Sequence, residues 1–281
     1  MYATAVERPP LEIMRYGTIM RPLPTDPREA WGVLNPGGAR GPDGQLYLFP
    51  RIVAEGNVSR VAIGRVRFGR DGEPIDVDRL GVVLEPETPY EMAPGGLGGC
   101  EDPRITYIAA LDRYVMAYAA LDYMHPRVAL AISHDLLTWQ RLGLVDLAPE
   151  RGIEWNALTD KDASFFPEPI NDPEGRPSLA LVHRPTYMMS HPDATITVEL
   201  PHGVEDPRDS IWISYADLAA AQGDVRSLTH LRHHRLLATP RADWEQLKIG
   251  GGTAPVLTHL GWLMLYHGVT VEPQVVPSAH P

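Results

Sequence analysis

Short runs in which polar and apolar residues alternate recur along the chain, whereas helical periodicity is scarce. Residues 59–68 (SRVAIGRVRF) alternate and are followed by the turn residues GRDG, a pattern that predicts a β-strand before a tight turn. Similar patterns predict further strands at residues 45–49, 113–118, 127–132, 178–183, 210–214 and 261–267. The best helix candidate covers 217–222 and is ended by Gly223. The chain is therefore expected to be mainly β.

The predicted strands come in similar units, each with a Gly- or Pro-containing loop, a strand, a polar residue and a second strand. The units recur roughly every 60–80 residues, a spacing compatible with propeller blades that carry loop insertions. We expect residues 1–281 to form a single β-propeller domain, with a β-sandwich as the alternative. Residues 270–281 form a Pro-rich tail with little strand pattern, which does not fit the closing strand of a propeller.

Composition narrows the possible partners and surroundings. The 281 residues carry a net charge of −11, which argues against general binding to nucleic acid or to an anionic membrane. The single cysteine, Cys100, excludes an intrachain disulfide framework and is interpreted as a small packed residue in a reducing compartment. The N-terminus lacks the pattern of a secretory signal, so a cytoplasmic protein is expected.

Four segments carry the polar residues that suggest chemistry. They are Asn35-Pro36-Gly37-Gly38 with Arg51 after it, Glu101-Asp102-Pro103-Arg104, Lys161-Asp162 with His183-Arg184, and Lys248 to Pro255 with Tyr266-His267. The second segment together with the three residues before it, GGC, is interpreted as a stiff loop that presents an acid just before a strand. Equivalent loops of a propeller converge on its central channel, so the four segments are expected to form one cleft.

The residue types in this cleft suggest sugar chemistry and anion binding. A carboxylate among polar groups is typical of sugar recognition and glycosidic cleavage, and Lys161 with Arg184 suits an anion. The alternatives are a solvated turn at 101–104 and an exposed ion pair between Lys161 and Asp162. A histidine-rich stretch at 230–234 is interpreted as a solvated linker, and no metal site is predicted.

Five blocks together resemble glycoside hydrolase family 130, the inverting β-mannoside phosphorylases and related β-mannosidases. They are NPGGAR with LYLFPR, GGCEDPRITY, KDASFFPEPI with LVHRP, IWISYADL, and KIGGGTAPVLTHLGWLMLYHGV, in the order of the family, between Asn35 and Val269. The resemblance implies a five-bladed β-propeller with a central active site. Members of the family continue past the last block, so an incomplete propeller with an exposed sheet edge is expected.

The resemblance also implies roles for single residues. It makes Asp102 the general acid, whose proton reaches the glycosidic oxygen through a hydroxyl of the mannose. It assigns phosphate binding to Lys161, Arg184, Tyr266, Arg51 and His267, and the sugar site to Asn35, Arg104 and Asp162. No metal or organic cofactor is implied, because inorganic phosphate is a co-substrate. The implied partners are a β-mannoside oligosaccharide and phosphate, and a homo-oligomer is a further possibility.

Three functions stay open at this stage. A phosphorylase would release α-mannose 1-phosphate, and the presence of Lys161 and Arg184 favours it because phosphate needs only a cationic cradle. An inverting β-mannosidase needs a second carboxylate, from Glu154, Glu168 or Glu205, roughly 6.5–9.5 Å from the first. The third possibility is an inactive carbohydrate-binding remnant of the enzyme.

Overall fold

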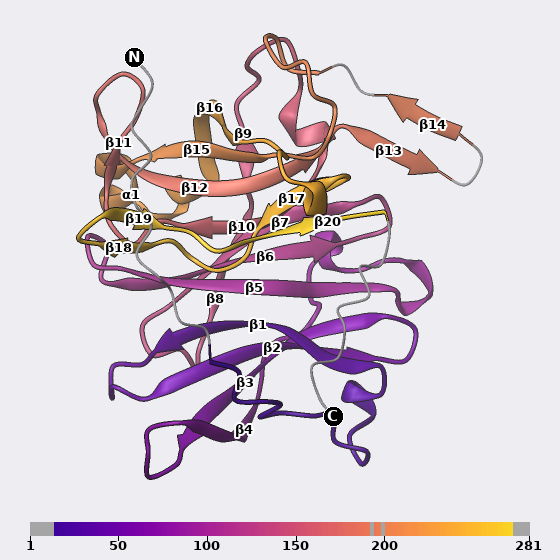
Figure 1. Ribbon diagram of the computed structural model, residues 1–281, viewed down its shortest axis with the longest axis vertical. Coiled ribbons are helices and arrows are strands. Elements are labelled where there is room, and N and C mark those ends of the chain that lie inside the picture. Colours follow the sequence, from indigo (N-terminus) through magenta and orange to yellow (C-terminus); the bar gives the residue numbers. More distant parts are fainter. Residues whose placement is uncertain (1–13, 192–193, 198–199, 272–281) are drawn as a thin grey trace.

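The computed structural model describes residues 14–191, 194–197 and 200–271 (Figure 1). As predicted, the protein is mainly β. Two consecutive antiparallel units make up the first half. They consist of β1 (Gly32–Arg40), β2 (Leu46–Ala54), β3 (Val58–Phe68) and β4 (Pro74–Leu84), then β5 (Gly98–Ile108), β6 (Arg113–Leu121), β7 (Pro126–Ser133) and β8 (Gln140–Leu144).

The third unit and the strands after it occupy the second half. The third unit contains β10 (Thr159–Phe165), β12 (Pro177–Thr186), β15 (Ile211–Asp217) and β16 (His230–Ala238), with β11 (Ile170–Asn171) on β12 and β9 (Asp146–Leu147) parallel to β16. The remaining strands pair as β13 (Met188–His191) with β14 (Ala194–Thr197), β17 (Lys248–Gly251) with β20 (Tyr266–Val269), and β18 (Val256–Thr258) with β19 (Gly261–Leu263).

Helical segments are short and lie between the strands. The α-helix α1 (Leu218–Gly223) begins after Asp217, whose side chain accepts a hydrogen bond from Ala220 N, so the predicted helix is confirmed within one residue. The 3₁₀ turns are η1 (Pro27–Glu29), η2 (Pro89–Glu91), η3 (Pro94–Gly96), η4 (Trp155–Ala157), η5 (Val225–Thr229) and η6 (Asp243–Glu245). Within the described ranges, no helix is both long and apolar enough to cross a membrane.

The units follow one another as propeller blades do. The first strand of each unit lies against the first strand of the next, β1 against β5, β5 against β10 and β10 against β17. Figure 1 shows the indigo, magenta and orange strands stacked in this order. The arrangement is propeller-like. The blade count of five and the exposed edge stay predictions, and the Pro-rich tail lies outside the described residues from 272 onward.

Three local predictions are wrong. The segment 98–104 is not a loop before a strand but the start of β5, because a bulge lets the strand continue through Pro103. Residues 261–267 form two strands, β19 and β20, which belong to different sheets. The histidine-rich stretch is not a solvated linker, since it forms β16 and His234 is fully buried.

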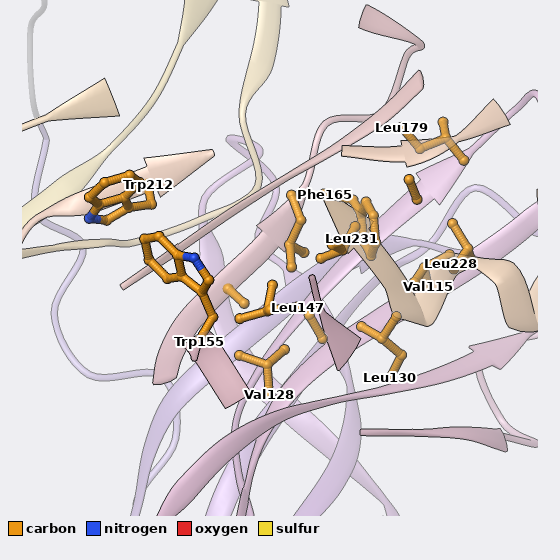
Figure 2. Close-up of a cluster of buried hydrophobic side chains, with 14 of the residues drawn as sticks. Val115, Val128, Leu130, Leu147, Trp155, Phe165, Leu179, Trp212, Leu228 and Leu231 are labelled. Carbon is orange, nitrogen blue, oxygen red and sulfur yellow. The ribbon is translucent and has the colours of Figure 1, made fainter. Parts of the chain in front are cut away.

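The second and third units are held together by a continuous apolar core (Figure 2). Leu130 of β7 and Leu179 of β12 are fully buried in it, and Trp155 packs edge-on against Trp212 at a centroid distance of 4.8 Å. A second cluster fills the first two units and includes Cys100, which is buried as predicted. These clusters fix the angle between units and so the position of the first strands.

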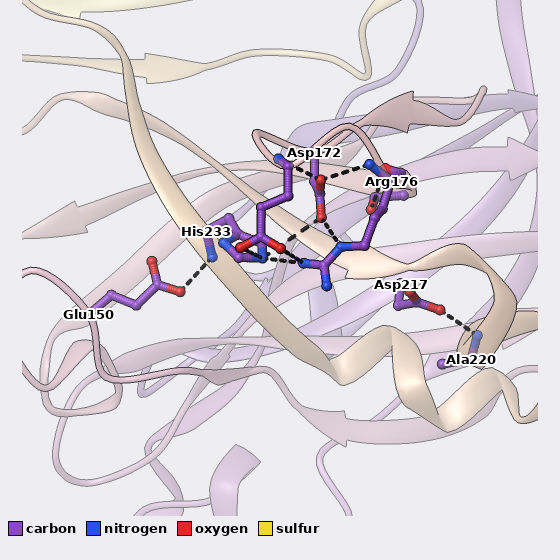
Figure 3. A network of polar contacts seen from close by, with 8 residues as sticks. Glu150, Asp172, Arg176, Asp217, Ala220 and His233 are labelled. Carbon is purple, nitrogen blue, oxygen red and sulfur yellow. Dashed lines mark hydrogen bonds and ion pairs between the residues drawn. The ribbon is translucent and has the colours of Figure 1, made fainter.

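A polar network fastens the turn between β11 and β12 to β16 (Figure 3). Asp172 accepts hydrogen bonds from Glu174 N and from Arg176 N and Nε, which closes the turn. Arg176 Nη2 lies 2.7 Å from His233 Nε2, and Glu150 accepts from His233 N. These contacts hold β16 against the turn before β12. They fix His233, whose backbone has a left-handed conformation with φ 59°.

We expect Leu130→Ala to lower the free energy of unfolding by about 2–5 kcal/mol, because the cavity forms in a core that cannot collapse onto it. Leu137→Ala is the matched control, since Leu137 is 55% exposed, and it should change stability by less than about 0.5 kcal/mol. Urea unfolding of both variants measures the difference. Equal effects would contradict the assignment of Leu130 to the core that joins the units.

Candidate active site

A β-bulge recurs at the same place in the first strand of three units. The pairing register shifts between Leu34 and Gly37 in β1, between Glu101 and Arg104 in β5, and between Lys161 and Ser164 in β10. The bulged residues Asn35, Asp102 and Asp162 have φ of 44°, 49° and 55°, a left-handed conformation that Asn and Asp tolerate best among non-glycine residues. Each bulge re-aims one polar side chain.

Asp102 is held by the first unit. Its Oδ1 accepts from Asn35 Nδ2 at 2.8 Å and from Arg51 Nη1 at 3.3 Å. The close approach of β1 and β5 requires Gly37, where a Cβ would lie 2.6 Å from Pro103 O. Asn35, Arg51 and Asp102 are therefore brought together, as the sequence predicts.

Arg51 joins Asp102 to its neighbour Glu101, which was not singled out as a site residue. Arg51 Nη2 donates to Glu101 Oε1 at 2.5 Å, and Ser59 Oγ donates to the same oxygen at 3.1 Å. Burial raises the pKa of Glu101 above its usual value, against the opposing effect of the Arg51 charge. The charge of Asp102 raises it further, and that of Lys161 lowers it. Glu101 is thus a buried carboxyl whose ionisation depends on the cations around it.

The third unit supplies a buried arginine. Arg184 Nε donates to Asp162 Oδ2 at 2.7 Å and Nη1 donates to Asp209 Oδ2 at 2.8 Å, with the side chain only 2% exposed. Thr186 Oγ1 donates to the same Asp209 oxygen. Two carboxylates hold the guanidinium in a fixed orientation, so Arg184 has little conformational freedom to lose when an anion binds.

Arginine and histidine residues occupy equivalent positions on the strands that pair with the first strands. Arg51 pairs with Leu34 at the bulge of β1, Arg184 pairs with Lys161 in β10, and His267 pairs with Gly250 in β17. The bulge of β5 faces Ala119 instead. These side chains lie beside the first strands because the same strand pairing is repeated in each unit, and no local sequence motif is needed.

Lys161 and Lys248, like Arg104, have no close acidic partner among the described residues. Within the described part of the chain, no carboxylate oxygen lies within 4 Å of either ammonium nitrogen. The pKa of Lys248 is lowered by burial and then by the charges of Arg184 and Lys161. Lys248 was not among the predicted site residues. Its place two residues before Gly250-Gly251-Gly252 is the available signal.

His267 lies beside the same ion pair. Its Nε2 is 3.7 Å from Asp162 Oδ2, and a Cβ at Gly250 would collide with both side chains, so only glycine permits this approach. Burial lowers the pKa of His267, Asp162 raises it, and the charges of Arg184, Arg104 and Lys248 lower it further. These mutual effects place the histidine and the cations within one electrostatic site.

Arg104 and Tyr266, two of the predicted site residues, form hydrogen bonds to groups other than the acidic side chains of the cluster. Arg104 donates from Nη1 to the main-chain oxygens of Pro103 and Asp102, at 3.1 and 3.4 Å, so it lines the site from β5. Tyr266 precedes His267 on β20 and therefore faces the opposite side of the strand. Its hydroxyl donates to Glu245 Oε1 at 2.7 Å and its ring lies against Trp244. The structure does not bring Tyr266 into the cluster.

The carboxylates considered for a hydrolase are spread around the third unit. Glu154, Glu168 and Glu205 are all exposed. Glu168 follows the end of β10 remote from Lys161, whereas Glu154 precedes its start. Over the described ranges, no group of three or more His, Cys, Asp or Glu side chains is arranged to hold a metal ion.

Two bulged aspartates, Asp102 and Asp162, thus lie among several cationic side chains on the first strands of a propeller-like fold. The model of glycoside hydrolase family 130, described as beta-1,4-mannooligosaccharide phosphorylase, matches residues 24–276. The chain therefore belongs to this family, which confirms the resemblance drawn from its motifs.

Curated relatives are phosphorylases of β-mannosides. The chain is 29% identical over 213 residues to a 1,2-β-oligomannan phosphorylase of Thermoanaerobacter sp. (strain X514), covering 73% of this chain and 53% of that protein. It is 30% identical over 215 residues to a β-1,2-mannobiose phosphorylase of Listeria innocua, covering 76% and 47%. The chain thus spans about half the length of the curated relatives it matches.

A solved structure supports the fold. The β-1,2-mannobiose phosphorylase from Listeria innocua, in complex with β-1,2-mannobiose, superposes with a TM-score of 0.60 at 22% identity. The superposition covers 90% of this chain and 73% of that one. At this identity the likeness shows a shared fold.

We expect Asp162→Asn to lower the pKa of His267 further, because it removes the carboxylate that stabilises the imidazolium. Lys248→Met should raise that pKa, because it removes a repelling charge. Proton NMR titration of the His267 ring measures both. Shifts of the same sign in the two variants would contradict the electrostatic site described here.

Proposed function

We propose that this protein catalyses the inverting phosphorolysis of β-mannosides, with α-mannose 1-phosphate as the product. In this reaction the bond between mannose C1 and the glycosidic oxygen breaks, and a bond forms between C1 and a phosphate oxygen. The leaving oxygen takes up a proton that Asp102 supplies as general acid, by way of a mannose hydroxyl. Inorganic phosphate is the nucleophile, and the scheme needs no metal or organic cofactor.

The observation that carries this proposal is the juxtaposition of Asp102 with unneutralised lysines. Lys161 influences the ionisation of Glu101, which shares Arg51 with Asp102, and it also influences that of Lys248. Phosphate is already a nucleophile, so catalysis requires cations that hold it in line and an acid for the leaving group. Both are supplied within one cluster.

The contacts of Asp102 suit the role of proton donor. Oδ1 is engaged by Asn35 and Arg51, and over the described residues no hydrogen bond reaches Oδ2. Oδ2 is therefore the oxygen that we assign to carry the proton. Asn35, Arg104 and Asp162 come from the neighbouring first strands β1, β5 and β10, and we assign them to the mannose ring.

The phosphate site extends from Lys161 toward the last strands. We assign Lys161, Arg184, His267 and Lys248 to it, since they influence one another electrostatically. Arg184 acts from its existing ion pairs, as a rigid fork of donors. Arg51 is also proposed as a phosphate ligand, and its carboxylate partner Glu101 would have to share it with phosphate. Tyr266 contacts Glu245 and Trp244 on the other face of β20, so we do not assign it to the phosphate site.

We also propose that the complete fold is a five-bladed propeller around this site. The described residues form three four-stranded units and the further pair β17 and β20, whose strands already contribute Lys248 and His267. A closed ring of blades would surround the cluster on all sides and exclude water from the phosphate.

The test is a panel of small β-mannosides incubated with and without inorganic phosphate, scored for mannose 1-phosphate and free mannose. We expect mannose 1-phosphate only when phosphate is present. Asp102→Asn should reduce its formation about 10²–10⁴-fold. Asp112→Asn is the matched control, because Asp112 is another left-handed aspartate, paired with Tyr107 outside the cluster, and should keep the full rate. Free mannose in both buffers would identify hydrolysis instead, and no product would indicate a binding protein.

We expect Arg184→Ala to raise the KM for phosphate at least about tenfold, because the variant loses a charge-assisted contact, while the KM for the mannoside changes less. Arg176→Ala is the matched control, since Arg176 is also paired with carboxylates but lies at the turn before β12. Initial rates at varied phosphate and mannoside separate the two constants. An equal rise of both constants would argue against a phosphate site at Arg184.

A further inference from the structure

A continuous chain of hydrogen bonds runs through the third unit directly behind Lys161 and Arg184. Asp160 Oδ2 lies 2.6 Å from His183 Nδ1, and His183 Nε2 lies 2.7 Å from Ser214 Oγ. Ser214 Oγ lies 2.7 Å from His234 Nδ1, whose Nε2 lies 2.8 Å from Ala148 O. The chain therefore crosses β10, β12, β15 and β16 in order and ends on a main-chain carbonyl.

All four side chains of this relay are buried. Asp160 is 5% exposed, His183 1%, and Ser214 and His234 are fully buried. No substrate reaches Ser214, whose hydroxyl is already engaged by two imidazoles, so the Asp-His-Ser order here does not make a nucleophile. The role of the relay has to be sought in what it does to its neighbours.

The number of protons in the relay follows from its ends. The carboxylate of Asp160 and the carbonyl of Ala148 both only accept, so the four hydrogen bonds between them require four protons. A neutral His183, a neutral His234 and the Ser214 hydroxyl supply one each. If every bond is made, one extra proton must therefore reside on Asp160, His183 or His234, and we place it on an imidazole, which is the more basic group.

The surroundings of His183 and His234 decide which of the two rings carries that proton. His234 has its pKa lowered to about 4, by burial first and by the His183 charge second, so it stays neutral. It then donates from Nε2 to Ala148 O and accepts at Nδ1 from Ser214. Ser214 in turn accepts from His183 Nε2, which leaves His183 Nδ1 to donate to Asp160. His183 is consequently the doubly protonated ring.

Other charged and titratable groups lie near the relay and influence how its protonation changes with pH. Glu150 accepts from the main-chain N–H groups of His233 and His234. Burial and the nearby Asp160 raise the pKa of Tyr187, so its hydroxyl stays neutral. The groups that face the relay from the surrounding segments are Glu150, Arg151, Tyr187, Asp209 and Arg184.

The relay reaches the proposed phosphate site through the main chain. Asp160 Oδ1 accepts from Arg184 N at 3.1 Å. Asp160 is paired in register with Pro185, which has no N–H to donate, so the carboxylate supplies the hydrogen bond that fixes β12 at this point. Lys161 follows Asp160 and Arg184 follows His183, and the two cations are paired across the strands.

We propose that Asp160, His183, Ser214 and His234 form a proton-retaining relay whose His183 imidazolium keeps Asp160 fixed, and that these positioning residues thereby orient Arg184 and Lys161 for the anion. The positioning role rests on the proposed function of the site. The relay residues contact no substrate. They act through the Asp160 carboxylate on the main chain of Arg184.

The first measurement is the ring-nitrogen NMR spectrum of ¹⁵N-histidine-labelled full-length protein at pH 8. We expect one histidine with both ring nitrogens protonated, assigned by its loss in His183→Gln. In Ser214→Ala the Nε2–H has no acceptor, so this ring should lose its proton at a lower pH. A wild-type spectrum with every histidine neutral, or an unchanged titration in Ser214→Ala, would overturn the proposal.

The second measurement is the Kd for inorganic phosphate by calorimetry, which does not depend on turnover. Ser214→Ala should weaken binding about tenfold at pH 8, since small displacements of positioned groups are costly. Ser214→Thr keeps the hydroxyl and should restore the wild-type Kd. Ser210→Ala is the matched control, because Ser210 is equally buried but donates to Arg208 O.

The two measurements separate the relay from the function it serves. If wild-type protein binds no phosphate, the proposed function and the positioning role both fail, while the proton on His183 is still decided by the spectrum. A Ser214→Ala variant that binds phosphate as tightly as wild type at pH 8 would overturn the positioning role alone. Equal weakening in Ser210→Ala would do the same, because it would reveal a general effect of buried serine loss.

Discussion

The candidate site depends on one backbone feature, the left-handed bulge in the first strand of successive units. In a regular strand Asn35, Asp102 and Asp162 would alternate into the faces between units, where the apolar clusters lie. The bulge turns them instead toward the neighbouring first strands, where Asn35 meets Asp102. Each unit tolerates this because Asn and Asp accept positive φ at little cost. The contacts between units then bring Asn35 to Asp102, while Asp162 meets Arg184 and His267.

Charge is distributed unevenly among the cations of the site. Arg51 and Arg184 are bound to carboxylates that fix their geometry, whereas Lys161 and Lys248 have no such partner among the described residues. The arginines therefore supply direction and the lysines supply unneutralised charge. This division suits an anion that must be held both strongly and in line with a sugar carbon. Asp162, one of the carboxylates that hold Arg184, also lies beside His267. The proposed sugar and anion parts of the site therefore share this residue.

Sequence patterns predict the strands and much of the site, because both follow from local alternation and from repetition. The meeting of Asn35, Arg51 and Asp102 follows once the units are recognised as equivalent. Asp209 and His234 were not predicted, since each acts through a partner on another strand, Arg184 and Ser214, that no spacing reveals. The sequence predicts a loop at Gly98–Arg104 because glycine and proline usually interrupt strands, whereas in the structure Gly98 and Gly99 pair with β3 and Pro103 lies in a bulge of β5.

Burial and the crowding of like charges are the basis on which we propose that the cluster binds an anion. Burial first, and then the charges of Arg184 and Lys161, lower the pKa of Lys248. An anion among these groups would reverse that effect, so binding and proton retention on Lys248 favour each other by linkage. A neutral sugar would offer no such gain. The electrostatic strain of the cluster is thus the physical reason to assign phosphate to the side of Lys161, Arg184 and Lys248, and the sugar to the side of Asn35 and Asp102.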